Sequence, residues 1–115
     1  MYSVTAAFIA WLNQKGYSAH SYPPNNENEF VTVERTGGNV ADMVDRPTIA
    51  IQTWATTEER AEDMANEVRL LVLTSSLPDG VQTARINTGA YRFYDEDTRL
   101  PRFQLVLDVV SQLTE

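Results

Sequence analysis

Side chains able to perform acid–base, nucleophilic or metal chemistry are few in this chain of 115 residues. The chain has one histidine, His20, and no cysteine, which excludes disulfides and thiolate-bound metals. A hydrolytic site needs a nucleophile and a base that activates it. This chain has one histidine and no serine in a recognisable nucleophile turn, so the sequence predicts no such pair. We interpret His20, in a polar segment next to Pro23 and Pro24, as a solvent-exposed side chain.

Two groups of carboxylates are the remaining candidates for binding a cation. Asp42 and Asp45 flank two apolar residues, and residues 95–97 are consecutive acids. Neither group has the spacing and central glycine of a calcium loop, and the glycines form no phosphate-binding pattern ahead of a helix. The sequence therefore predicts no catalytic residue, no metal and no cofactor, and a protein that is not an enzyme.

The overall charge narrows the range of partners. Sixteen acidic residues against nine basic ones give a net charge of -7. Tight binding to nucleic acid needs clustered cations, which this chain lacks. The uncharged stretch from Met1 to Gln14 is too short to cross a bilayer and has no basic leader, so we expect a cytosolic protein with no membrane partner. The length is typical of a single domain, covering residues 1–115.

Hydrophobic periodicity in the first half predicts a helix followed by a strand. Apolar residues recur at helical spacing from Ser3 to Lys15, and Gly16 can end that helix. Residues 30–35 are rich in β-branched types and predict a strand, closed by the glycine-containing run 36–39. Residues 40–46 have no clear period, and we interpret them as a loop or short arm.

The second half predicts a strand, a long helix and a hairpin. Residues 48–55 alternate, with Ile49 and Ile51 on one face and Trp54 on the other. A capping box formed by Thr56 and Glu59 predicts the start of a helix. The apolar stripe of that helix comprises Ala61, Met64, Ala65, Val68, Leu71 and Val72. The extended segments 81–94 and 103–110 pair most simply as a hairpin around the loop 95–101.

This order of elements predicts an α+β fold, a two-layer sandwich in which two helices pack on one face of a mostly antiparallel sheet of four to five strands. The order is helix, three strands, helix and two strands. Since the helices cover one face only, the other face must be polar, wet or occupied by another molecule.

Aromatic residues on the uncovered face indicate a partner. Trp54 and the segment from Tyr91 to Tyr94 would expose rings in a monomer, and aromatics with arginine are typical of interface cores. The candidate subunit contacts are Arg46, Trp54, Tyr91, Arg92, Phe93 and Tyr94. The alternative is that the rings pack within a curved sheet or under the 36–46 segment.

Acidic residues gather on the polar side of the second helix. They are Glu58, Glu59, Glu62, Asp63 and Glu67. A solvated helix face accounts for them, and the helix dipole favours anions near its start. The functional alternative is an acidic surface, such as a lumen wall, past which something negatively charged slides without binding.

Three segments, taken in order, resemble the small tail-terminator, or tail-completion, proteins of long-tailed bacteriophages. The first is the N-terminal helix ending at Gly16 and followed by FVTVERTGG. The second is DRPTIAIQTWATTEERAEDMANEVRLLVL, in which a strand runs directly into a long helix. The third is TGAYRFYDEDTRLPRF, leading into the last strand.

The resemblance implies a structural protein of the virion, assembled in the host cytoplasm. Such a protein forms a ring, commonly of six subunits, on the head-proximal end of the tail tube, where it ends polymerisation and meets the head connector. Its partners would be its own copies, the tube protein and the connector, with DNA passing through unbound. The alternatives are another neck or head-completion (stopper) protein and a small ligand-binding domain with a pocket lined by Trp54, Tyr91 and Phe93.

Overall fold

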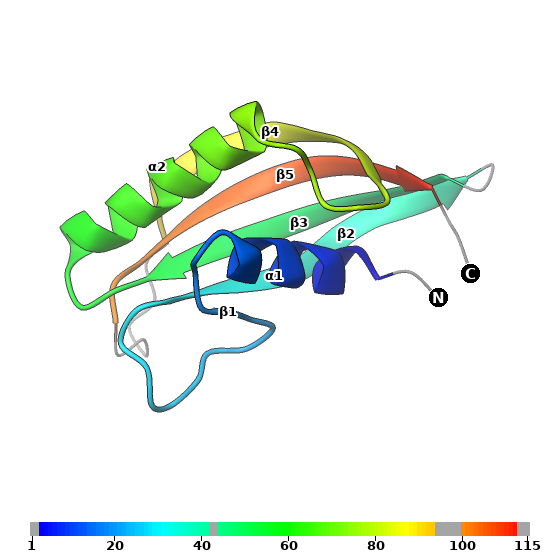
Figure 1. Ribbon diagram of the computed structural model, residues 1–115. Coiled ribbons are helices and arrows are strands. Elements are labelled where there is room, and N and C mark those ends of the chain that lie inside the picture. Colours follow the sequence, from blue (N-terminus) through cyan, green and yellow to red (C-terminus); the bar gives the residue numbers. More distant parts are fainter. Residues whose placement is uncertain (1–2, 42–43, 94–99, 113–115) are drawn as a thin grey trace.

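The computed structural model describes residues 3–41, 44–93 and 100–112, and in this part both helices lie on one side of a five-stranded sheet (Figure 1). The elements in chain order are α1 (Val4–Gln14), β1 (Ala19–His20), β2 (Phe30–Ala41), β3 (Val44–Trp54), α2 (Glu58–Thr74), β4 (Val81–Arg92) and β5 (Arg102–Gln112). The predicted α+β class and order of elements are confirmed.

The helix α1 has the boundaries that its sequence dictates. The Ser3 hydroxyl accepts a hydrogen bond from the Ala6 amide at 3.2 Å and caps the helix. Gly16, with a φ of 99°, adopts the left-handed conformation typical of the residue after a helix. The apolar stripe is buried against the sheet at Val4, Phe8, Trp11 and Leu12.

The helix α2 begins one residue later than predicted. Thr57, not Thr56, is the cap, and its hydroxyl accepts from the Arg60 amide at 3.1 Å, so the predicted capping box with Glu59 is wrong. The chain is still held to the sheet just before this point, because the Ala55 amide donates to the Pro101 carbonyl at 3.2 Å. The chain is thus tied to the sheet as far as Ala55, and the helix begins three residues later, at Glu58.

The sheet has the strand order β1-β2-β3-β5-β4. β1 is parallel to β2, and the other neighbours are antiparallel, including the predicted hairpin of β4 and β5. The hydrophobic core fills the space between one sheet face and both helices. Its fully buried large side chains on the sheet include Val31, Val33, Ile49, Ile51, Leu105 and Leu107.

The predicted end of the strand at 36–39 is wrong, and in the segment 40–46, predicted as a loop or short arm, residues 40–41 and 44–46 are strand, while 42 and 43 lie outside the described residues. β2 continues to Ala41 and pairs with β3 along its whole length, from Phe30 opposite Trp54 to Ala41 opposite Val44. A register shift between Arg35 and Gly37 absorbs the irregular glycine run. Pairing with a long neighbour thus overrides the low strand propensity of glycine.

An ion pair holds this long hairpin together beyond the bulge. Both terminal nitrogens of Arg35 donate to the Asp45 carboxylate, at 2.8 and 2.7 Å, and Arg35 Nε donates to the Gly37 carbonyl at 3.1 Å. The pKa of Arg35 is raised, first by the hydrogen bonds to Asp45. Asp45 is buried and already bound, so it does not form the cation site considered with Asp42, which lies outside the described residues.

Replacing Gly38 with alanine should destabilise the protein far more than replacing Gly37. Gly38 has a φ of 112°, and a Cβ there would overlap the Arg46 carbonyl oxygen and lie 2.6 Å from Pro47 Cα. The strain alone corresponds to about 1–3 kcal/mol. Gly37→Ala is the matched control, because a Cβ there meets nothing within 4 Å. Urea unfolding of both variants measures the difference, and equal losses would contradict the strained geometry.

Candidate interaction surface

The sheet face away from the helices carries a row of rings around an arginine. Phe30, Trp54 and Arg102 are in register on β2, β3 and β5. The rings of Phe30 and Trp54 stack with centroids 5.3 Å apart. The guanidinium carbon of Arg102 lies 4.6 Å from the Trp54 centroid and 4.1 Å from that of Phe93. Such cation–π contacts stabilise a fold by about 0.5–2 kcal/mol each.

A second row on the same face lies two residues further along the strands and is polar. Its members are in register on four strands: Thr32, Gln52, Gln104 and Tyr91. Thr32 donates to Gln52 at 2.8 Å, Gln52 donates to Gln104 at 2.7 Å, and Gln104 donates to the Tyr91 hydroxyl. The Trp54 indole donates to Thr32 at 3.0 Å and joins the two rows. The row therefore satisfies its buried amides internally.

The expectation that Trp54 is exposed in a monomer is wrong, because its residue is only 6% exposed. Among the other candidate contacts, Tyr91 and Phe93 are half-buried in these rows, and Tyr94 lies outside the described residues. Arg46 and Arg92 are exposed. Trp54 therefore packs within the sheet, which is the alternative given in the sequence analysis. Exposure no longer supports Trp54 as a subunit contact.

The most exposed part of the sheet is the second half of β2, from Glu34 to Ala41, which we call the outer β2 segment. Every residue in it is exposed, whereas the first half of β2 is buried. Among the described residues, β1 pairs with β2 only at Val31 and Thr32, so the outer β2 segment has a neighbour on one side only. Its outward N–H and C=O groups are free to pair with another strand. Val40, 55% exposed, adds apolar area there.

The opposite edge of the sheet, β4, is less suited to pairing. Its pairing with β5 shifts register at three places between Val81 and Tyr91. Bulges and charged side chains such as Arg85 are devices that keep an edge strand from adding another chain. The two edges therefore differ in kind, and the outer β2 segment is the more open one.

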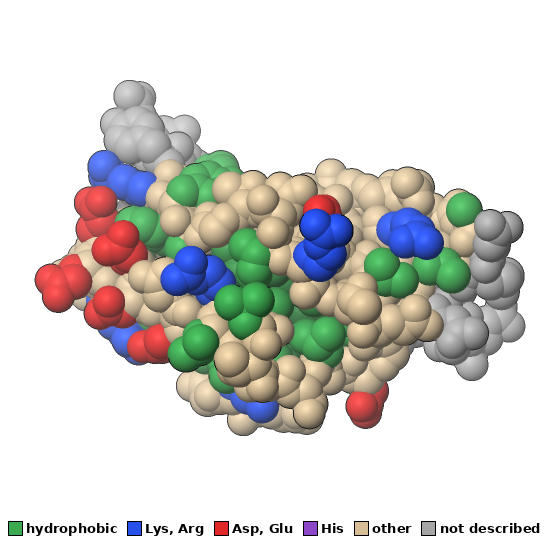
Figure 2. All heavy atoms as spheres, turned by 90° about the horizontal axis from the view of Figure 1, so that it is seen from above, with side chains coloured by type: hydrophobic (Ala, Val, Ile, Leu, Met, Phe, Trp, Pro, Cys, Tyr) green, Lys and Arg blue, Asp and Glu red, His purple; other side chains and the backbone are tan. Residues whose placement is uncertain are grey.

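The acidic residues predicted on the polar side of α2 fall into two groups, those that form ion pairs and those that do not. Glu58 forms an ion pair with Arg92 at 3.6 Å. Glu59, Glu62 and Asp63 are exposed and form no ion pair with any described residue. Acidic side chains are grouped at the left end of the molecule in Figure 2, where α2 begins.

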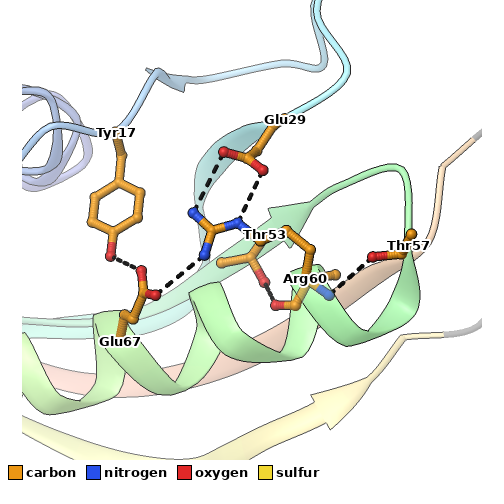
Figure 3. A network of polar contacts seen from close by, with 7 residues as sticks. Tyr17, Glu29, Thr53, Thr57, Arg60 and Glu67 are labelled. Atoms are coloured by element: carbon orange, nitrogen blue, oxygen red, sulfur yellow. Dashed lines mark hydrogen bonds and ion pairs between the residues drawn. The ribbon is translucent and has the colours of Figure 1, made fainter.

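Glu67 belongs to a separate network that ties α2 to the chain around β1 (Figure 3). It accepts from the Tyr17 hydroxyl at 2.7 Å and from Arg60 at 3.2 Å, and Arg60 also binds Glu29 at 2.9 Å. Burial and the hydrogen bond to Glu67 raise the pKa of Tyr17 well above its usual range. Glu67 is therefore a structural side chain and not a free acid.

His20 is also more engaged than predicted. It is half-buried, and its Nε2 lies 2.9 Å from both the Glu27 carboxylate and the Ser18 hydroxyl, so the reading as a simple solvent-exposed side chain is wrong. Among the described residues, no group of three or more His, Asp or Glu is placed to hold a metal. The acids 95–97 lie outside those residues. No helix in the described ranges is long and apolar enough to span a membrane.

Two hollows lie away from the ring row. One, of about 410 Å³, separates α1 from the connection between α2 and β4, near Trp11, Lys15 and Pro78. The other, of about 330 Å³, lies on the uncovered sheet face near the outer β2 segment and is lined by Arg46 and Arg85. Neither has Trp54, Tyr91 or Phe93 in its wall, so neither supports the aromatic ligand pocket considered above.

No family model matches this chain, and no curated protein matches it in sequence. The sequence predicts the outer β2 segment only as far as Arg35, whereas the strand continues to Ala41. The alternation of Val31 and Val33 with polar residues ends before Gly37, so the continuation has no local signal and depends on pairing with β3.

The stability of the protein should fall as the pH rises above about 10, the ordinary pKa of tyrosine. The folded state raises the pKa of Tyr17, so its contribution is complete below that pH and is lost above it. Tyr17→Phe should lose about 0.5–1.5 kcal/mol at neutral pH, the value of one hydrogen bond, and should show a shallower alkaline decline. Urea midpoints across this range measure it. Tyr22→Phe, 68% exposed, is the control and should keep the native profile.

Trp54→Ala should destabilise the folded chain by about 3–5 kcal/mol, the usual loss for a buried large aromatic. The substitution removes the stack with Phe30, the contact with Arg102 and the hydrogen bond to Thr32. Chemical unfolding at low protein concentration measures the loss in the absence of assembly. Tyr22→Ala should change stability by no more than about 0.5 kcal/mol. A Trp54→Ala chain as stable as the native one would return Trp54 to the list of subunit contacts.

Proposed function

We propose that this chain is a structural assembly protein of the phage tail-terminator kind. In this role, copies of the chain join into a ring at the head-proximal end of the tail tube, end tube polymerisation and form the joint to the head connector. The observation that carries the proposal is the outer β2 segment, which is exposed on both faces and pairs on one side only.

Such a segment is what strand addition between subunits requires. A neighbouring chain that pairs with it would satisfy its free backbone groups and bury Val40. Since β4, at the other edge, is bulged, the two edges are not alike, and a second copy would bind through a different patch of its surface. Contacts between unlike patches generate rings when the rotation between copies closes.

The acidic start of α2 supports the more specific assignment. Glu59, Glu62 and Asp63 are exposed without ion pairs in the described part of the chain, and the net charge is -7. Fixed negative charge near a lumen repels a DNA phosphate backbone and lets it pass without binding. The terminator role itself rests on the resemblance in the order of segments.

Purified protein mixed with tail tubes tests the proposal. Electron microscopy should show rings at one end of each tube, and sedimentation should show species larger than a monomer. Tails assembled without this protein should be abnormally long. Tails of normal length that fail to join heads would instead assign a stopper role, and a strict monomer that ignores tubes would overturn the proposal.

Val40→Lys should weaken assembly while leaving the monomer folded. Val40 is exposed in the single chain, so a lysine there costs little in stability, but it would place a charge where a neighbouring strand pairs. Leu73→Lys is the matched control: Leu73 is a 63% exposed apolar residue on α2, far along the chain from the outer β2 segment. Sedimentation velocity compares the two. Equal assembly of both variants would remove the outer β2 segment from the interface, and loss in Leu73→Lys alone would move the interface to the C-terminal part of α2.

A further inference from the structure

The hollow on the uncovered sheet face contains two arginines and one carboxylate. Arg46 on β3 and Arg85 on β4 both line it, together with Thr48 and Asp108. Both arginines are exposed, and neither forms an ion pair with any described residue. Asp108 stands opposite Arg85 in the strand register and accepts a hydrogen bond from the neutral Asn87 amide at 2.9 Å, so the lining has two cations and one carboxylate. The hollow is a positive site on an acidic protein.

The carboxylates that could match it lie at the other end of the molecule. Arg46 is near the start of β3, and α2 follows the end of that strand, after Trp54. At about 3.3 Å per residue, the eight steps from Arg46 to Trp54 alone span roughly 26 Å. The longest dimension of the molecule is 43 Å. The acidic start of α2 therefore cannot reach the hollow of its own chain.

The spacing of these carboxylates suits a compact positive site. Glu59, Glu62 and Asp63 stand three and four residues apart on α2, so they share one helix face. Arginine binds carboxylates through paired, charge-assisted hydrogen bonds. Within the described residues, the carboxylates of this face form no ion pair, and the hollow keeps an excess of one positive charge over Asp108.

We infer that the hollow of Arg46 and Arg85 receives the acidic start of α2 from a second copy of this chain. The inference rests on the proposed function, because it names the patches that would join neighbours in the assembly. Gly38 and Asn39 also line the hollow, so the docked helix end would lie beside the outer β2 segment. The two patches are unlike and lie at opposite ends of the molecule, so the contact is head-to-tail. A pair of copies then keeps one unused patch on each copy, to which further copies can bind.

Charge favours a second copy over DNA as the occupant. A chain with a net charge of -7 repels a phosphate backbone over distances on the order of a Debye length, about 10 Å at 0.1 M salt. A second copy carries the same overall charge, but its carboxylates are concentrated on one helix face, which attracts the arginines locally. Its surface can also contact the outer β2 segment.

Charge reversal in both patches tests the contact. The variant Arg46→Glu/Arg85→Glu should assemble at least about tenfold more weakly than the native chain, as should Glu62→Arg/Asp63→Arg, because like charges would then face each other. In an equimolar mixture of the two variants, the reversed patches match again, and assembly should return to within a few-fold of native. Sedimentation velocity at low and high salt measures it, and native assembly should weaken as salt rises.

Controls carry the same kind of charge reversal elsewhere, with one substitution each and so half of the total charge change. Arg69→Glu and Asp79→Arg alter exposed residues outside both patches and should assemble as the native chain does. Thermal unfolding checks that each variant is folded. Arg46→Gln/Arg85→Gln removes the attraction without adding charge beside Asp108, and it should weaken assembly by a smaller factor.

The outcomes separate the inference from the proposed function. Rings that persist in both reversal variants, or a mixture that fails to recover, would overturn the inference and leave the assembly role standing. Charge-dependent assembly that never engages tail tubes would support the inference and overturn the terminator role. A native chain that stays monomeric at every salt concentration would overturn both. Binding of a short DNA duplex that is lost on reversing the two arginines would make the hollow a nucleic-acid contact and overturn the inference.

Discussion

The register of β3 between β2 and β5 is the constraint on which the other features depend. It places Ile49 and Ile51 under the helices, and Gln52 and Trp54 on the opposite face. Because side chains alternate between faces, a slip of one residue would exchange the two sets and bury the glutamine under the helices. Thr53, on the helix side, donates to the Ala61 carbonyl at 2.7 Å, so the same register also fixes where α2 starts. The positions of both rows, the arginine hollow and the acidic helix end all follow from it.

The parts of the fold that could be predicted from sequence are those set by local periodicity. The stripes of α1 and α2 and the alternation in β3 needed no knowledge of neighbours, and their order was enough to define the α+β class. Three expectations failed because cross-strand partners decided them. Pairing with β3 carries β2 through Gly37 and Gly38, and the contact of Ala55 with Pro101 moves the helix cap to Thr57. The burial of Trp54 depends on Phe30 and Arg102, which are distant in sequence.

Charges in this molecule are separated along its length, and the internal contacts sharpen the separation. The Tyr17, Arg60 and Glu29 network engages Glu67, and Arg92 engages Glu58. What remains at the start of α2 is a smaller group of free carboxylates on one helix face. At the other end, Asp45 binds Arg35 on the helix side of the sheet and leaves Arg46 without a partner in the described chain. Fewer charged side chains are thus available for contacts between copies than a count of charged residues indicates.

The outer β2 segment is ordered before any neighbour binds it, and this bears on how strongly it could bind. Fixing the backbone of a residue costs about 1–2 kcal/mol in conformational entropy, so a segment that became a strand only on contact would lose much of the gain from association. Here the pairing with β3 and the bridge from Arg35 to Asp45 already hold the strand extended in the single chain. The conformational entropy of this segment is therefore lost when the chain folds, and burial of the first half of the same strand offsets that loss. A neighbour that adds a strand would then gain its backbone hydrogen bonds against an edge that is already in place.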